Sequence, residues 1–215
     1  MHVGITGRQW RRLLLLAGLL LLPWLACAKG QATTPTVLVL GDSLSAAHNL
    51  PAGTGWVDLL GKRLATGQGA RGKVVNASMS GETTAGAATR PPGLLARESP
   101  DVVVIALGGN DALRGLTPAQ IRANLEKMIV ASQKARAKVL VLGIDVPPNY
   151  GPAYRQRLAT VYRELATQYK VPLLPFLLEG VALQPGMMQA DGLHPTEAAQ
   201  PKVLATVWPL LQPLL

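Results

Sequence analysis

Short apolar runs rich in β-branched residues recur along the chain and alternate with segments of helical periodicity. The runs that predict strands cover residues 36–40, 73–76, 102–107, 139–144 and 171–174. Their hydrophobicity is continuous rather than alternating, so we expect both faces of the sheet to be covered, as in parallel sheets flanked by helices. The pattern therefore predicts a three-layer α/β domain with a parallel sheet.

Three other segments have the apolar spacing of helices that bury one face. The clearest begins at Thr117-Pro118-Ala119-Gln120, where a threonine N-cap, a proline in the first helical position and a glutamine in the third mark a helix start. Apolar stripes over residues 56–64 and 154–169 predict two more helices, and we interpret all three stripes as core faces. The C-terminal stretch has helical composition, but three prolines predict a broken or kinked helix. These prolines are Pro201, Pro209 and Pro213.

The start of the chain differs in composition from the rest. Residues 1–12 are basic without any acid, and they lead into a short apolar block that ends in Ala26-Cys27-Ala28, a pattern typical of signal-peptide cleavage. We therefore predict a signal peptide over residues 1–28 and a single exported domain over residues 29–215, in the periplasm or outside the cell. Two weaker alternatives are a retained membrane anchor, for which the apolar block is short, and a lipoprotein attached through Cys27.

Composition narrows the classes of partner. The chain has one cysteine, Cys27, so the exported domain is expected to lack both a disulfide and a thiol nucleophile. The formal net charge of the whole chain is +9, but the basic residues are dispersed and aromatic residues make up only 4%. Nucleic-acid binding is therefore disfavoured. We interpret the excess charge as solvated helix faces, with weak association with anionic membrane surfaces as an alternative.

Polar or conformationally permissive residues follow the first three predicted strands. Ser43 follows the first strand, Gly81 comes a few residues after the second, and Asn110 follows the third. Because the carboxyl ends of parallel strands share one edge of a sheet, we expect these residues to converge where ligands collect. Near the C-terminus, Asp191-Gly-Leu-His194 adds a carboxylate and an imidazole. This set is sufficient for Ser-His-Asp nucleophilic catalysis.

Each group of this set has a defined chemical task. A serine hydroxyl is a weak nucleophile, so a base must accept its proton during attack on a carbonyl, and His194 is the candidate base for Ser43. Asp191 would hold the imidazole in the correct tautomer and stabilise its protonated form. The N–H groups of Ser43 and Gly81 and the side-chain amide of Asn110 would donate hydrogen bonds to the oxyanion. Each residue alone has a structural interpretation as a cap or turn, but the ordered set favours catalysis.

Other residues are interpreted as structural, and several motifs are missing. We interpret Asp42 as a cap or loop-bracing residue and His48 as a surface or loop histidine. After Leu40 there is no glycine-rich phosphate loop and no Lys-Ser pair. No HExxH or paired-histidine cluster indicates a metal. The G-x-S-x-G elbow of α/β-hydrolases is also missing around Ser43.

Four ordered blocks resemble the SGNH hydrolases, also called GDSL-type esterases and lipases, over nearly the whole predicted domain. The blocks cover residues 41–44, 76–83, 108–111 and 191–195. The resemblance implies a flavodoxin-like, five-stranded parallel sheet flanked by helices, with no metal or other cofactor. It also implies the roles argued above, with Ser43, Asp191 and His194 as catalytic residues. The oxyanion hole would again comprise Ser43, Gly81 and Asn110.

Within the family, residues 108–116 and 191–201 are most similar to secreted bacterial thioesterase I, arylesterase and lysophospholipase enzymes. In that branch the segment after the asparagine is a mobile loop over an acyl groove. The corresponding residues are Asp111, Ala112, Leu113, Arg114, Gly115 and Leu116. The chain departs from the branch at Ala47-His48-Asn49, where relatives commonly carry a glycine and a tyrosine, and this departure is expected to alter the groove wall.

These observations predict an exported serine esterase that hydrolyses small-molecule carboxylic esters, thioesters or lysophospholipids through an acyl-serine intermediate. Because exported enzymes meet little acyl-CoA, lysophospholipids and small or aryl esters are the favoured substrates. One alternative is an O-acetylesterase that acts on carbohydrate or peptidoglycan. Another is a non-catalytic binding module of the same fold.

Overall fold

A computed structural model describes Met1 and residues 34–67, 70–182 and 184–215. The compact unit that contains the predicted site residues spans Thr34–Leu215. The predicted signal peptide, apart from Met1, lies outside the described residues and stays a prediction. Cys27 also lies outside them, so the alternative of a lipoprotein attached there stays untested. No helix within the described ranges is long and apolar enough to cross a membrane.

Five parallel strands form one sheet in the order β2-β1-β3-β4-β5. The strands are β1 (Thr36–Gly41), β2 (Lys73–Asn76), β3 (Val102–Ala106), β4 (Lys138–Leu142) and β5 (Leu173–Leu174). This is the flavodoxin-like order, in which the chain reverses its direction of winding between β1 and β3. The predicted fold class and all five predicted strands are confirmed.

Continuous apolar runs explain why the central strands are covered on both faces. Residues 37–40 of β1 are at most 1% exposed, and all five residues of β3 are 0% exposed. β1 and β3 pair in parallel up to Gly41 opposite Ala106. The two strands therefore end at the same level, and the segments that follow them emerge side by side at the carboxyl edge of the sheet.

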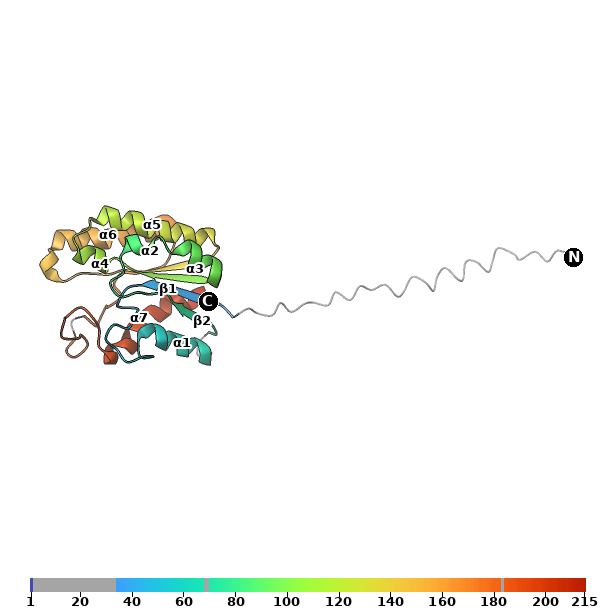
Figure 1. Ribbon diagram of the computed structural model, residues 1–215, viewed down its shortest axis with the longest axis horizontal. Coiled ribbons are helices and arrows are strands. Elements are labelled where there is room, and N and C mark those ends of the chain that lie inside the picture. The colour runs from blue at the N-terminus through green and yellow to red at the C-terminus, as the bar shows by residue number, and fades with distance from the viewer. Residues whose placement is uncertain (2–33, 68–69, 183) are drawn as a thin grey trace. The chain divides into compact units, whose positions relative to one another are not determined.

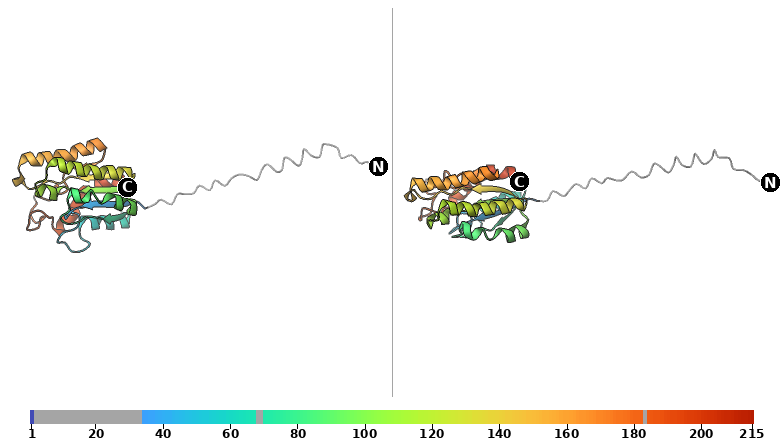
Figure 2. Two further views of the ribbon diagram at one scale, coloured as in Figure 1. Left: turned by 45° about the horizontal axis from the view of Figure 1, so that its top comes forward. Right: turned by 90° about the horizontal axis from the view of Figure 1, so that it is seen from above.

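Helices cover both faces of this sheet. They are α1 (Trp56–Thr66), α2 (Thr84–Ala87), α3 (Pro91–Glu98), α4 (Gly109–Leu113), α5 (Pro118–Lys134), α6 (Pro152–Tyr169) and α7 (Gln200–Leu211), with 3-10 turns at Pro148–Tyr150, Glu197–Ala199 and Gln212–Leu214. α1 and α7 lie against one face, and the other helices lie on the opposite side, which makes three layers (Figure 1). Both views in Figure 2 show the yellow-green α5 beside the orange α6.

The clearest of the predicted helix starts is confirmed in detail at α5. The hydroxyl of Thr117 accepts a hydrogen bond from the N–H of Gln120 (3.3 Å), and Oε1 of Gln120 accepts one from the N–H of Thr117 (3.0 Å). This capping box satisfies two N–H groups that would otherwise lack partners. Ile121, Leu125 and Met128 are 0% exposed, so the predicted stripe is a core face.

The C-terminal helix is not broken at two of the three prolines. α7 runs without interruption over Gln200–Leu211, with Pro201 in its first turn and Pro209 inside its last turn. The N–H groups of a first turn have no partner within the helix, so Pro201 costs little there. Only Pro213 lies beyond the α-helix, in the 3-10 turn Gln212–Leu214.

Candidate active site

The turn after β1 presents Ser43 at the carboxyl edge of the sheet. Asp42 braces this turn, because its Oδ1 accepts a hydrogen bond from the N–H of Leu44 (3.0 Å) and its carbonyl accepts one from the N–H of Ser45 (3.1 Å). A Cβ at Gly41 would lie 2.7 Å from the Ser45 side chain, so only glycine permits this close approach. The interpretation of Asp42 as a loop-bracing residue is confirmed.

The hydroxyl of Ser43 and the carboxylate of Asp191 contact opposite nitrogens of the His194 ring. Nε2 of His194 lies 2.9 Å from Oγ of Ser43, and Nδ1 lies 2.6 Å from Oδ2 of Asp191. A carboxylate on Nδ1 favours the tautomer with its proton there, which leaves Nε2 free to accept the proton of the hydroxyl. The geometry therefore suits an activated serine nucleophile.

A tight turn holds Asp191 and His194 side by side. Oδ1 of Asp191 accepts hydrogen bonds from the N–H groups of Leu193 (2.9 Å) and His194 (3.0 Å). Partial burial raises the pKa of Asp191, but the hydrogen bonds from the His194 ring and from these two N–H groups outweigh it and lower the pKa to about 2. The carboxylate is therefore ionised throughout the pH range in which an imidazole ordinarily changes charge.

Gly81 and Asn110 line the same cavity as Ser43. Gly81 has a φ of 77°, which favours glycine over any residue with a Cβ. Nδ2 of Asn110 donates a hydrogen bond to the carbonyl of Glu82 (3.0 Å) and lies 3.5 Å from Oδ2 of Asp42. Within the described part of the chain, the N–H groups of Ser43 and Gly81 donate no hydrogen bond to protein. Both are therefore available to an oxyanion.

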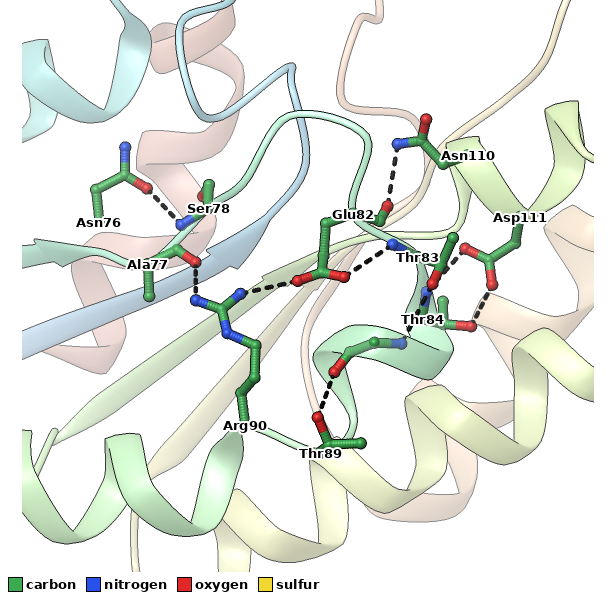
Figure 3. Close-up of polar contacts among 11 residues, drawn as sticks. Asn76, Ala77, Ser78, Glu82, Thr83, Thr84, Thr89, Arg90, Asn110 and Asp111 are labelled. Carbon is green, nitrogen blue, oxygen red and sulfur yellow. Dashed lines mark hydrogen bonds and ion pairs between the residues drawn. The ribbon is translucent and has the colours of Figure 1, made fainter.

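Buried polar contacts hold the helix that carries Asn110 (Figure 3). The carboxylate of Asp111 is fully buried and accepts hydrogen bonds from the N–H (2.8 Å) and the hydroxyl (2.5 Å) of Thr84 at the start of α2. Nδ2 of Asn124 on α5 donates to the same hydroxyl (3.2 Å). Because both carboxylate oxygens have partners, Asp111 fixes α4 against α2.

The predicted substrate loop over residues 111–116 is corrected at its start, because residues 111–113 are helical. Asp111 and Ala112 belong to α4 and are 0% exposed, because Asp111 is bonded into the core by α2. Leu113, the last residue of α4, does line the cavity. The irregular segment starts only after it, over residues 114–117.

A cavity of about 240 Å³ opens beside Ser43 and His194. Most of its wall is apolar, and apart from Leu113 the sequence analysis did not identify these residues as part of the site. The apolar lining residues are Leu44, Leu113, Ile144, Val146, Pro147, Phe176, Leu178 and Leu193. Several of them follow β4 or β5, so the rule that strand ends carry the site could have found them. Over the described ranges, no three His, Cys, Asp or Glu side chains cluster closely enough to hold a metal ion.

His48 is more than a surface or loop histidine. It lies in a turn, as expected, but it also lines the cavity and packs against His194, with the two ring centroids 4.5 Å apart. Nε2 of Gln189 donates to the carbonyl groups of His48 (3.1 Å) and Pro195 (3.0 Å) and so ties the two turns together. The earlier interpretation is corrected, because contacts between distant segments place this ring in the site.

Because the carboxylate of Asp42 is buried, the stability of the folded protein should depend on pH. Burial raises its pKa from 3.8 to about 6, against the opposing effects of the Leu44 N–H and the charge of His194. Between these two values the folded state binds more protons than the unfolded state, so this group's contribution to stability falls as the pH rises. Above pH 6 the shift in the pKa of Asp42 lowers the free energy of unfolding by about 3 kcal/mol relative to acidic pH.

Asp42→Asn keeps the acceptor for Leu44 but cannot ionise. We expect this variant to gain about 3 kcal/mol in free energy of unfolding over the wild type at pH 8 and almost nothing at pH 4. Urea unfolding at the two pH values measures the difference. An equal difference at both would show that the charge of Asp42 is not what matters.

A flavodoxin-like sheet with a serine, imidazole and carboxylate in contact at its carboxyl edge defines a hydrolase of the SGNH type. The chain belongs to the GDSL-like Lipase/Acylhydrolase family, whose model matches residues 39–200. The matched region includes all five residues predicted for catalysis and the oxyanion hole. The protein is therefore a hydrolase of this family.

Named relatives are similar over nearly the whole length of the chain. Esterase TesA of Pseudomonas aeruginosa is 54% identical over 204 residues, which are 95% of this chain and 100% of that protein. Thioesterase 1/protease 1/lysophospholipase L1 of Escherichia coli K12 is 40% identical over 184 residues, 86% of each protein. A similar solved structure is that of the psychrotrophic esterase EstA from Pseudoalteromonas sp., inhibited by monoethylphosphonate. It matches with a TM-score of 0.78 and 36% sequence identity, and the match covers 83% of this chain and 97% of that chain.

Proposed function

We propose that the protein hydrolyses carboxylic esters and thioesters through an acyl intermediate on Ser43. The observation that carries this proposal is the chain of contacts from Ser43 through His194 to Asp191 beside an apolar cavity. The names of the relatives support it, since they include an esterase and a thioesterase/lysophospholipase. The substrate class is small-molecule acyl esters and thioesters, lysophospholipids included.

The residues of the site divide the steps of the proposed reaction between them. Nε2 of His194 accepts the proton of the Ser43 hydroxyl as its oxygen attacks the carbonyl carbon. The protonated ring, stabilised by Asp191, then gives this proton to the departing alcohol or thiol as the bond to the acyl carbon breaks. Water attacks the acyl-serine with His194 again acting as base, and the acid leaves with the hydroxyl of Ser43 restored.

Removal of one oxyanion donor should lower kcat with little change in KM. Nδ2 of Asn110 lies in the cavity wall and is expected to bind the negative oxygen only as it forms. We therefore expect Asn110→Ala to lower kcat by about 10²- to 10³-fold, measured with a p-nitrophenyl ester. A raised KM with an unchanged kcat would show instead that Asn110 binds the substrate in its ground state.

The apolar wall of the cavity favours acyl groups longer than acetyl. Leu113, Ile144 and Phe176 offer no hydrogen-bonding side chain to a sugar, and they suit a hydrocarbon chain. We expect kcat/KM for p-nitrophenyl octanoate to exceed that for the acetate, in a series from acetate to longer esters. Activity restricted to acetate would support the alternative O-acetylesterase instead.

Export to the periplasm or the medium is also proposed, on the basis of the basic and then apolar N-terminal sequence over residues 1–28. Fractionation of cells that express the full chain tests it. The expected product is a shortened protein outside the cytoplasm that begins near residue 29. Full-length protein confined to the cytoplasm would contradict export.

A further inference from the structure

The loop that carries Gly81 has no regular secondary structure, and its shape depends both on main-chain hydrogen bonds, such as those from the N–H groups of Ala77 and Met79 to β1, and on side-chain contacts. It joins β2 to α2 over residues 77–83. Arg90, at the N-terminus of α3, links the two ends of this loop (Figure 3). Its Nη2 donates a hydrogen bond to the carbonyl of Ala77 (2.7 Å), and its Nη1 donates one to the carboxylate of Glu82 (3.1 Å).

The ion pair between Arg90 and Glu82 is partly shielded from water. The exposed fraction of the side chain is 25% for Arg90 and 11% for Glu82. The other carboxylate oxygen of Glu82 accepts a hydrogen bond from the N–H of Thr83 (3.1 Å). A Cβ at Gly86 would lie 2.3 Å from this oxygen, so the carboxylate occupies space that only glycine leaves open. A charge-assisted contact in this setting is stronger than a fully exposed ion pair.

Glu82 connects this ion pair to both candidate oxyanion donors outside Ser43. It follows Gly81 directly in the chain, and its main-chain carbonyl accepts the hydrogen bond from Nδ2 of Asn110 (3.0 Å). A shift of the Glu82 main chain would therefore move the peptide that joins Gly81 to Glu82 and displace the acceptor that orients the Asn110 amide. Neither Arg90 nor Glu82 lines the cavity beside Ser43.

We infer that Arg90 is a positioning residue for the oxyanion hole: by fixing Ala77 and Glu82, it sets where the Gly81 N–H and the Asn110 amide lie relative to Ser43. The inference rests on the proposed function, because it assumes that these groups stabilise an oxyanion. Misplacement of preorganised donors costs transition-state stabilisation, while the binding of the uncharged substrate is little affected. Arg90 thus acts on kcat and not on KM.

Arg90→Met, compared with Arg97→Met, tests this inference. Arg97 is a matched control, because it also belongs to the α3 region and pairs with a carboxylate, that of Glu98 (2.7 Å), but its side chain is 66% exposed. We expect Arg90→Met to lower kcat about tenfold or more, with KM changed less than about twofold. Arg97→Met should leave both constants unchanged. Arg90→Lys should be intermediate, because an ammonium cannot reproduce both contacts of the guanidinium.

An alkyl boronic acid adds a readout that loss of stability alone would not change. Its tetrahedral adduct on Ser43 places an oxygen in the oxyanion hole, so its affinity should fall in parallel with kcat in Arg90→Met. Gly86→Ala provides a second perturbation, because its methyl group displaces the Glu82 carboxylate while Arg90 is retained. It should also lower kcat and boronate affinity.

The outcomes separate this inference from the proposed function. Wild-type kcat and boronate affinity in Arg90→Met, or a change in KM alone, would overturn the positioning role and leave the esterase proposal intact. The positioning role would also be overturned if Arg90→Met had a lower melting temperature but kept the wild-type kcat at temperatures well below that melting temperature. If the wild-type protein itself shows no turnover that depends on Ser43, the proposed function fails first.

Discussion

Replacement of His194 by alanine is expected to lower kcat by about 10⁶-fold, the scale of loss seen when a serine hydrolase loses its base. The reason is geometric, since Nε2 of His194 is the ring nitrogen that contacts Oγ of Ser43 (2.9 Å). Without it, no side chain accepts the proton of the attacking hydroxyl. Turnover of a p-nitrophenyl ester at high enzyme concentration measures the residual rate.

His48 provides the control, because it is the other histidine of the described domain and its ring packs against His194. His48→Ala removes a ring from the cavity wall but leaves the contact between His194 and Ser43. We therefore expect it to lose far less activity than His194→Ala. Similar losses in the two variants would contradict the assignment of His194 as the base.

Asp191→Asn should lower kcat by about 10⁴-fold while the fold is retained. The amide oxygen of asparagine can still accept the N–H groups of Leu193 and His194, so the turn is preserved. Its NH₂ group would face Nδ1 of His194 and favour the tautomer with a proton on Nε2. That tautomer cannot accept the proton of Ser43, so the loss should appear in kcat.

The pH behaviour of Asp191 gives a further check on this variant. Its pKa is lowered to about 2 in the folded state, so the stability contributed by its ionised form is present above the ordinary pKa of 3.8 and is lost as the pH falls through about 2. Asp191→Asn should therefore be less stable than the wild type at neutral pH and mild acidity, and this difference in stability should disappear as the pH falls through about 2. An Asp191→Asn protein with wild-type kcat would contradict the orienting role.

The fold was predictable wherever local sequence pattern and tertiary structure agree. Continuous β-branched runs marked all five strands, because strands covered on both faces need no polar alternation. The capping box at Thr117 marked the start of α5 for an equally local reason. At α7 the local rule was insufficient: Pro201 falls in the first turn, where its missing N–H would have no partner within the helix, and α7 continues through Pro209 although this residue cannot donate a hydrogen bond.

The candidate site was predictable where it depends on strand ends, and less so where it depends on contacts between distant segments. Ser43, Gly81 and Asn110 follow three neighbouring strands, so topology alone brings them together. The burial of Asp111 depends on Thr84, 27 positions earlier, and no local pattern shows that contact. The packing of His48 on His194 is likewise visible only once the turns are placed.

Covalent labelling by an active-serine phosphonate tests the central claim most directly. The phosphorus should be attacked by Oγ of Ser43, activated by His194, with loss of the leaving group and a stable adduct detectable by mass spectrometry. We predict one adduct per wild-type molecule, located on Ser43, and none on Ser43→Ala. Failure of the wild type to react, or equal labelling of Ser43→Ala, would contradict the account.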